Sequence, residues 1–126
     1  MTKTITGVLL DTKTARVQRA TIPANLDSYY EHLDCRLIEV ASCTIGGKRF
    51  DIICDEEGLL RDDPIISALD RNYQPMLVGN LFVCKSKDGE FVSLTDKEID
   101  HVLRYAGKLP TRLHPEGLAM LTAVGY

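Results

Sequence analysis

The sequence lacks the features that mark membrane, exported and nucleic-acid-coating proteins. None of its apolar stretches approaches the roughly 18 residues that cross a membrane, and its first residues do not join a basic segment to an apolar one as an export signal does. Its formal charge is −3, whereas proteins that coat nucleic acids need clustered Lys and Arg to displace phosphate counterions. We therefore expect a cytoplasmic protein that has neither a membrane nor a nucleic-acid polymer as its partner.

The sequence also lacks the motifs of metal sites and of common catalytic sites. The four cysteines, Cys35, Cys43, Cys54 and Cys84, show no paired short spacing, so we expect reduced thiols in the core. The acidic stretch from Asp55 to Asp63 lacks the ligand spacing of a calcium loop. There is no phosphate-cradling glycine loop, no nucleophile elbow and no HExxH helix. We predict a protein that is not an enzyme and that holds no metal and no cofactor.

The most informative segment that is present is a predicted hairpin from Arg36 to Gly58. Its arms, 37–45 and 50–54, are rich in residues that suit strands, and Gly46-Gly47 supplies the positive φ of a tight turn. In the second arm, Phe50, Ile52 and Cys54 share one apolar face. That face is predicted to lie in the core.

The rest of the chain is predicted to form hairpins and short helices. Asn25 is a candidate N-cap, Thr95 and Glu98 match a capping box, and Gly107 is expected to end the helix that this box opens. The predicted strands are 3–10, 15–22, 76–85 and 90–94, and the predicted helices are 25–33, 64–70, 96–106 and 115–123. Together they predict a single α+β domain over residues 1–126, with an antiparallel sheet of about six strands built from hairpins and about two to four short helices.

A cationic segment lies within this acidic chain. Residues 101–115 contain three Lys or Arg side chains and two histidines, and no acid. Cationic side chains bind phosphate, an aromatic ring stacks on a base, and an amide bonds to the edge of that base. The candidate ligand-binding residues are Phe82, Asn80, Arg104, Tyr105, Lys108, Arg112 and His114, with Tyr73 as a further ring. The alternative is that Phe82 lies in the core and that the cations only stabilise the negative end of a helix.

The run from Tyr29 to about Leu103 carries the phrases DIICDEEGLL, LVGNLFV and DGEFVSLTDKEI. On these phrases the chain resembles a family of small proteins of phages and conjugative elements, and within it the phage anti-defence sponges that counter Thoeris immunity. The resemblance implies a non-catalytic homo-oligomer, a dimer or larger, in the host cytoplasm. Such a protein sequesters, without cleaving it, a cyclic ADP-ribose isomer made by a TIR-domain enzyme, and some members also hold cyclic oligonucleotides of the CBASS pathway.

The resemblance also implies a ligand pocket between subunits, with a ring stacked on adenine. Phe82 is the best match for that ring. Arg104, Arg112, Arg16 and Arg19 are candidates for contacts with phosphate by their charge alone. Residues 110–126 lie outside the resemblance.

Two other functions fit the sequence. The acidic side chains from Asp55 to Asp63 are typical of a DNA-like face, so the protein could instead bind and inhibit a host restriction or CRISPR enzyme. An inhibitor of this kind should lose function on charge reversal at Glu56, Glu57, Asp62 and Asp63. A sponge should lose function on Phe82→Ala or Arg112→Ala. A third hypothesis, a small hydrolase of a cyclic nucleotide, predicts turnover of the ligand.

Overall fold

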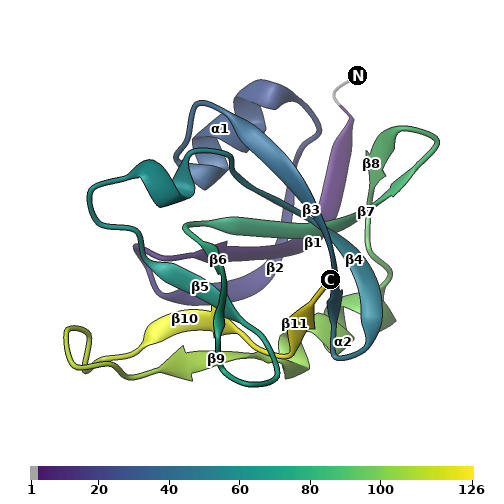
Figure 1. Cartoon of the computed structure of the whole chain (residues 1–126). Helices are drawn as coiled ribbons and strands as arrows, with labels where there is room; N and C mark the ends of the chain where they lie inside the picture. The colour runs from purple at the N-terminus through teal and green to yellow at the C-terminus, as the bar shows by residue number, and fades with distance from the viewer. Residues whose placement is uncertain (1–2) are drawn as a thin grey trace.

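The computed structural model describes residues 3–126 as two facing β-sheets with a helix on the outer side of the larger one (Figure 1). The larger sheet has seven strands, in the order β11 (Val124–Gly125), β3 (Ile38–Ile45), β4 (Lys48–Asp55), β7 (Leu81–Lys87), β1 (Thr4–Asp11) and β2 (Arg16–Pro23), with β8 (Glu90–Val92) paired to β7. The smaller sheet has the order β6 (Pro75–Val78), β5 (Ile66–Leu69), β10 (Leu118–Leu121) and β9 (Ala106–Leu109). The helices are α1 (Leu26–Leu33) and α2 (Asp96–Arg104), and a 3₁₀ turn spans Gly58–Leu60.

This architecture is the expected α+β class with mainly antiparallel pairing. Among the strands of residues 3–126, β5 and β10 alone run parallel to each other. The eleven strands of the described residues exceed the predicted six or so. The extra strands come mainly from the second sheet, which the sequence did not predict.

Two hairpins, β1–β2 and β3–β4, are paired over their whole length. Strands β1 and β2 pair from Thr4 opposite Pro23 to Asp11 opposite Arg16, and β3 and β4 pair along all eight residues of each strand. At the second turn Gly46 and Gly47 have φ values of 57° and 84°, a conformation that glycine adopts at little cost. The predicted hairpin over 36–58 is therefore confirmed.

The central strands β4 and β7 of the larger sheet carry buried side chains on both faces, since successive side chains point to opposite sides of a strand. In β7, Leu81 and Val83 point into the inner core between the sheets, whereas Phe82 and Cys84 point toward α1. The inner core contains, among others, Val8, Leu10, Phe50, Ile52, Cys54, Ile99, Val102 and Leu121. The helix-side core contains Ile5, Ile22, Tyr29, Leu33, Ile53, Phe82 and Cys84. The apolar face predicted for the second arm of the hairpin is thus buried as expected.

Both helices begin at the predicted caps. The Asn25 side chain accepts a hydrogen bond from the Ser28 N–H at 2.8 Å. At α2, the Glu98 N–H donates to the Thr95 hydroxyl at 3.2 Å and the Thr95 N–H donates to the Glu98 carboxylate at 2.8 Å. These bonds satisfy N–H groups that have no partner inside a helix.

Four predictions of secondary structure are wrong. Residues 64–70 and 115–123 contain strands β5 and β10 and not helices. Helix α2 ends at Arg104, so Gly107 lies within β9. The run 76–85 is two strands in different sheets, because the chain turns at Gly79, which has a φ of 77°, and at Asn80. Residues such as Ala, Leu and Met suit a helix locally, but pairing with β9 places β10 in a sheet.

The cysteines behave as small apolar residues. All four are free thiols; Cys43, Cys54 and Cys84 are buried and Cys35 is half-buried. Burial raises the pKa of the Cys54 and Cys84 thiols to about 12, so both are neutral at physiological pH. Within residues 3–126, no helix has the length and apolar character needed to cross a membrane.

Candidate functional site

Three of the predicted ligand-binding residues meet at the C-terminal end of α2. Arg104, Tyr105 and Lys108 line a hollow of about 130 Å³, together with Tyr73 from the turn between β5 and β6. Ala106, Gly107 and Leu109 of β9 and Met120 of β10 complete part of its wall. We call this site, defined by Tyr73, Arg104, Tyr105 and Lys108, the tyrosine–arginine hollow.

Tyr105 lines the hollow and contacts two segments that are distant in the chain. Its carbonyl oxygen accepts hydrogen bonds from the Thr122 N–H at 2.9 Å and the Thr122 hydroxyl at 3.1 Å. Its ring lies against Gly46, where a Cβ atom would come within 2.2 Å of the ring. The Tyr105 ring also lies 5.3 Å from the His101 ring, centroid to centroid. Tyr105 therefore joins the β3–β4 turn to the end of β10 and forms part of the wall of the hollow.

Tyr73 presents its ring to solvent from a backbone conformation that is unusual for a bulky residue. Its φ is 59° and 70% of the residue is exposed. The turn is held by Asp70, whose Oδ1 accepts hydrogen bonds from the Asn72 N–H at 2.8 Å and the Gln74 N–H at 2.9 Å. Unusual backbone conformations persist where neighbouring bonds enforce them, and they cluster at functional sites.

Neither cation of the hollow forms an ion pair within residues 3–126. Arg104 and Lys108 are exposed, and neither forms an ion pair with a carboxylate of residues 3–126. Arg19, by contrast, pairs with Asp96 at 2.7 Å. The hollow therefore combines positive charge with an accessible aromatic ring.

Phe82 and Asn80, two of the predicted ligand-binding residues, do not line the tyrosine–arginine hollow. Phe82 is 0% exposed and lies in the helix-side core, so its ring has no face free for stacking. Asn80 uses its amide within the fold: Oδ1 accepts from the Thr12 N–H and hydroxyl, both at 2.9 Å, and Nδ2 donates to the His32 carbonyl at 3.1 Å. Phe82 lies on the face of β7 that packs against α1, and Asn80, in the turn just before β7, bonds to the last turn of the same helix.

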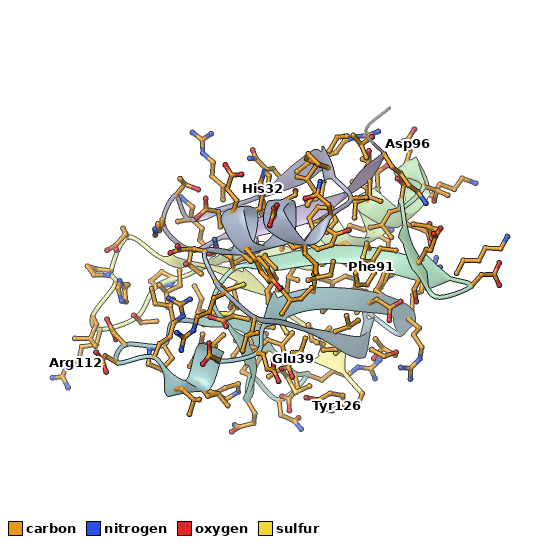
Figure 2. All side chains as sticks on the ribbon, turned by 90° about the horizontal axis from the view of Figure 1, so that it is seen from above. His32, Glu39, Phe91, Asp96, Arg112 and Tyr126 are labelled. Carbon is orange, nitrogen blue, oxygen red and sulfur yellow. The ribbon has the colours of Figure 1, made fainter. Side chains whose placement is uncertain are left out.

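Arg112 and His114 lie apart from the hollow, on the loop between β9 and β10. Arg112 is exposed at the periphery of the molecule (Figure 2). The His114 Nδ1 lies 3.4 Å from the Glu116 carboxylate. Neither residue lines the hollow.

The acidic stretch is partly neutralised inside the chain. The Asp55 carboxylate is 4% exposed and accepts hydrogen bonds from the Arg61 Nε at 2.7 Å and the Glu57 N–H at 2.8 Å. Arg36 contacts Glu57 through two nitrogens, at 2.7 and 3.1 Å, and this hydrogen bonding lowers the pKa of the Glu57 carboxyl. Among residues 3–126, no three His, Cys, Asp or Glu side chains gather as a metal site would require.

Sequence reasoning missed the residues that shape the hollow. Asp70 stands two residues before Asn72, a spacing typical of an Asx turn. That signal was available, but the helix predicted over 64–70 concealed it. No local signal pointed to Gly46 or Thr122, because their contacts with Tyr105 join segments distant in the chain.

A known protein family matches the part of the chain that runs from β1 into β9. The model of a domain of unknown function, DUF3846, matches residues 5–107. The chain belongs to the DUF3846 family. The DUF3846 match contains three residues of the hollow, Tyr73, Arg104 and Tyr105, and ends one residue before Lys108. No curated protein and no solved structure matches the chain.

Proposed function

We propose that the protein binds and sequesters, without cleaving it, a small cyclic nucleotide signal at the tyrosine–arginine hollow. A cyclic ADP-ribose isomer is the first candidate ligand, and cyclic oligonucleotides are the second. The observation that carries the proposal is an exposed ring, Tyr73, in one hollow with two cations, Arg104 and Lys108, that form no ion pair within residues 3–126. The ring would stack on the base and the cations would bind the phosphates. Tyr73 thereby takes the role that the resemblance suggested for Phe82.

The size of the hollow makes a second chain part of the proposal. Its volume is about 130 Å³, whereas ligand sites usually enclose roughly 300–1,000 Å³. Sequestration at about nanomolar affinity corresponds to roughly 12 kcal/mol, more than one ring and two cations provide. In a homo-oligomer, a second chain that covers the exposed side of the ligand would supply the remaining binding free energy.

Titration calorimetry tests the proposal. The purified protein is titrated with cyclic ADP-ribose isomers and with cyclic di- and trinucleotides, and the bound material is released by heat and analysed by chromatography. Tight binding with recovery of unchanged ligand is expected. Absence of binding across the panel, or recovery of a cleaved product, would contradict the proposal.

Variants at Tyr73 locate the site without disturbing the turn. Tyr73→Asn removes the ring, while Asn tolerates the positive φ of this position. It should weaken binding about 5- to 150-fold, as expected for the loss of one stacked base. Tyr73→Phe keeps the ring and should bind as the wild type does. Equal binding by both variants would place the ligand elsewhere.

The alternative function, inhibition of a host restriction or CRISPR enzyme through an acidic face, has less support. Two of its five carboxylates, Asp55 and Glu57, already pair with arginines of the same chain. Glu56, Asp62 and Asp63 remain exposed. If no cyclic nucleotide binds, charge reversal at these three residues in a pull-down with the target enzyme is the next test.

A further inference from the structure

An apolar groove with an acidic rim lies on the side of the molecule where the C-terminus ends. It has a volume of about 270 Å³ and lies between β6, the end of β4 and Tyr126. Leu59, Met76 and Val78 contribute apolar surface, and the exposed Glu39 and Glu56 stand at its edge. Asp55 adds little charge to the rim, because its carboxylate pairs with Arg61. We call this feature the acid-rimmed groove. Its chemistry suits a segment that presents an apolar side chain beside a cation.

The same chain carries such a segment in the loop 110–117, which we call the leucine loop. Leu113 is 86% exposed, the highest value among the large apolar side chains of the described residues. Its neighbour Arg112 is also exposed and pairs with no carboxylate of residues 3–126.

The leucine loop is preorganised. The Thr111 N–H donates to the His114 carbonyl and the His114 N–H donates to the Thr111 hydroxyl, each at 3.0 Å. The Gly117 N–H donates to the same His114 carbonyl at 3.0 Å. These bonds close the loop with Arg112 and Leu113 at its tip. A preordered loop loses little conformational entropy when it is buried.

We propose that the leucine loop of one copy inserts into the acid-rimmed groove of a second copy. Leu113 would lie against Leu59, Met76 and Val78, and Arg112 would lie between Glu39 and Glu56. The leucine loop does not line the groove of its own chain, and Arg112 lies away from Glu39 and Tyr126 (Figure 2). The two surfaces differ, so the contact is heterologous. Each copy then donates one loop and accepts another, which builds a closed ring or an open chain. This assembly is independent of the proposed nucleotide function.

Sedimentation velocity over a range of protein concentrations tests the contact. The wild-type protein is expected to associate with rising concentration, and added salt should weaken the association. Leu113→Asp and Leu59→Lys should each sediment as monomers. Leu60→Lys is the matched control, since Leu60 is as exposed as Leu59 but lines a different cleft, beside Arg36 and Arg61. Association of the Leu60→Lys chain should equal that of the wild type.

Mixing the two variants separates a heterologous contact from a symmetric one. The Leu113→Asp chain keeps its groove and the Leu59→Lys chain keeps its loop, so an equimolar mixture should form a dimer with one chain of each kind and nothing larger. Both substitutions lie at exposed positions, so both chains should fold, and urea unfolding of each confirms it. A monomeric wild type at every concentration, a Leu113→Asp chain that still associates, or a mixture that stays monomeric would each overturn the proposal.

Discussion

The α1 end of the molecule and the C-terminal end of α2 contain similar charged residues but use them differently. At the α1 end, ion pairs join Lys13 to Asp34, Arg36 to Glu57 and Arg61 to Asp55. Arg61 also donates from Nη2 to the Asp34 carbonyl at 2.5 Å, which ties the acidic stretch to the end of α1. At the α2 end, Arg104 and Lys108 pair with no carboxylate of residues 3–126. The first group of charges therefore holds loops together, and the second remains available to a ligand.

The aromatic and amide residues show the same contrast: those at the α1 end are buried in the fold, and the ring at the α2 end is exposed. Phe82 and Asn80, at the α1 end, are buried, and the Asn80 amide bonds to Thr12 and to the His32 carbonyl. Tyr73, at the other end, is exposed and is held in place by the turn beneath it. Residue type alone does not distinguish a binding residue from a structural one. The distinction depends on which contacts the fold gives to each side chain.

The largest difference in stability between the two ends should appear when an aromatic ring is removed from each end. Phe82→Ala should lower the free energy of unfolding by about 3–5 kcal/mol, because it leaves a cavity in the helix-side core. Tyr73→Asn should change it by less than about 1 kcal/mol, since the residue is exposed. Urea unfolding followed by circular dichroism measures both. Phe82→Leu, which refills most of the volume, serves as the control, and similar losses for Phe82→Ala and Tyr73→Asn would contradict the comparison.

Removing an arginine from each end should again lower the free energy of unfolding more at the α1 end, but by a smaller amount. Arg61→Ala leaves the buried Asp55 carboxylate without its ion-pair partner, which should cost about 2 kcal/mol of stability given the half-exposed arginine. Arg104→Ala removes no ion pair and should stay within about 0.5 kcal/mol of the wild type. The same unfolding assay applies. An equal loss for both variants would show that Arg104 also has a structural role.

The smallest expected effect is on the pH dependence of stability, through the ion pair of Arg36 and Glu57 at the α1 end. The Arg36 guanidinium holds the pKa of the Glu57 carboxyl below its ordinary value of 4.5. A carboxyl whose pKa is lower in the folded state stabilises the fold above pH 4.5, and this contribution is lost as the pH falls through the lowered pKa. Arg36→Ala should return the Glu57 pKa toward 4.5 in an NMR titration and make the acid decline of stability shallower. Arg104→Ala is the control and should leave the Glu57 pKa unchanged.

The elements that were correctly predicted depend on local signals. Gly46-Gly47, Asn25 and the Thr95–Glu98 pair specify a turn and two helix starts through bonds within a few residues. The site was only partly predictable for the same reason. Arg104, Tyr105 and Lys108 are close in sequence and meet in space, whereas Tyr73 joins them because β5 and β6 pair within the second sheet.

The sequence by itself determined the hairpin over 36–58, the two helix caps, the apolar face of Phe50, Ile52 and Cys54, and the cationic segment. Each depends on the chemistry of neighbouring residues. Only the tertiary structure decided that both faces of β7 are buried, that the segments around Ala68 and Met120 are strands, and that the leucine loop and the acid-rimmed groove lie apart. These outcomes depend on contacts between distant segments, because burial and strand pairing follow from which surfaces meet when the two sheets pack.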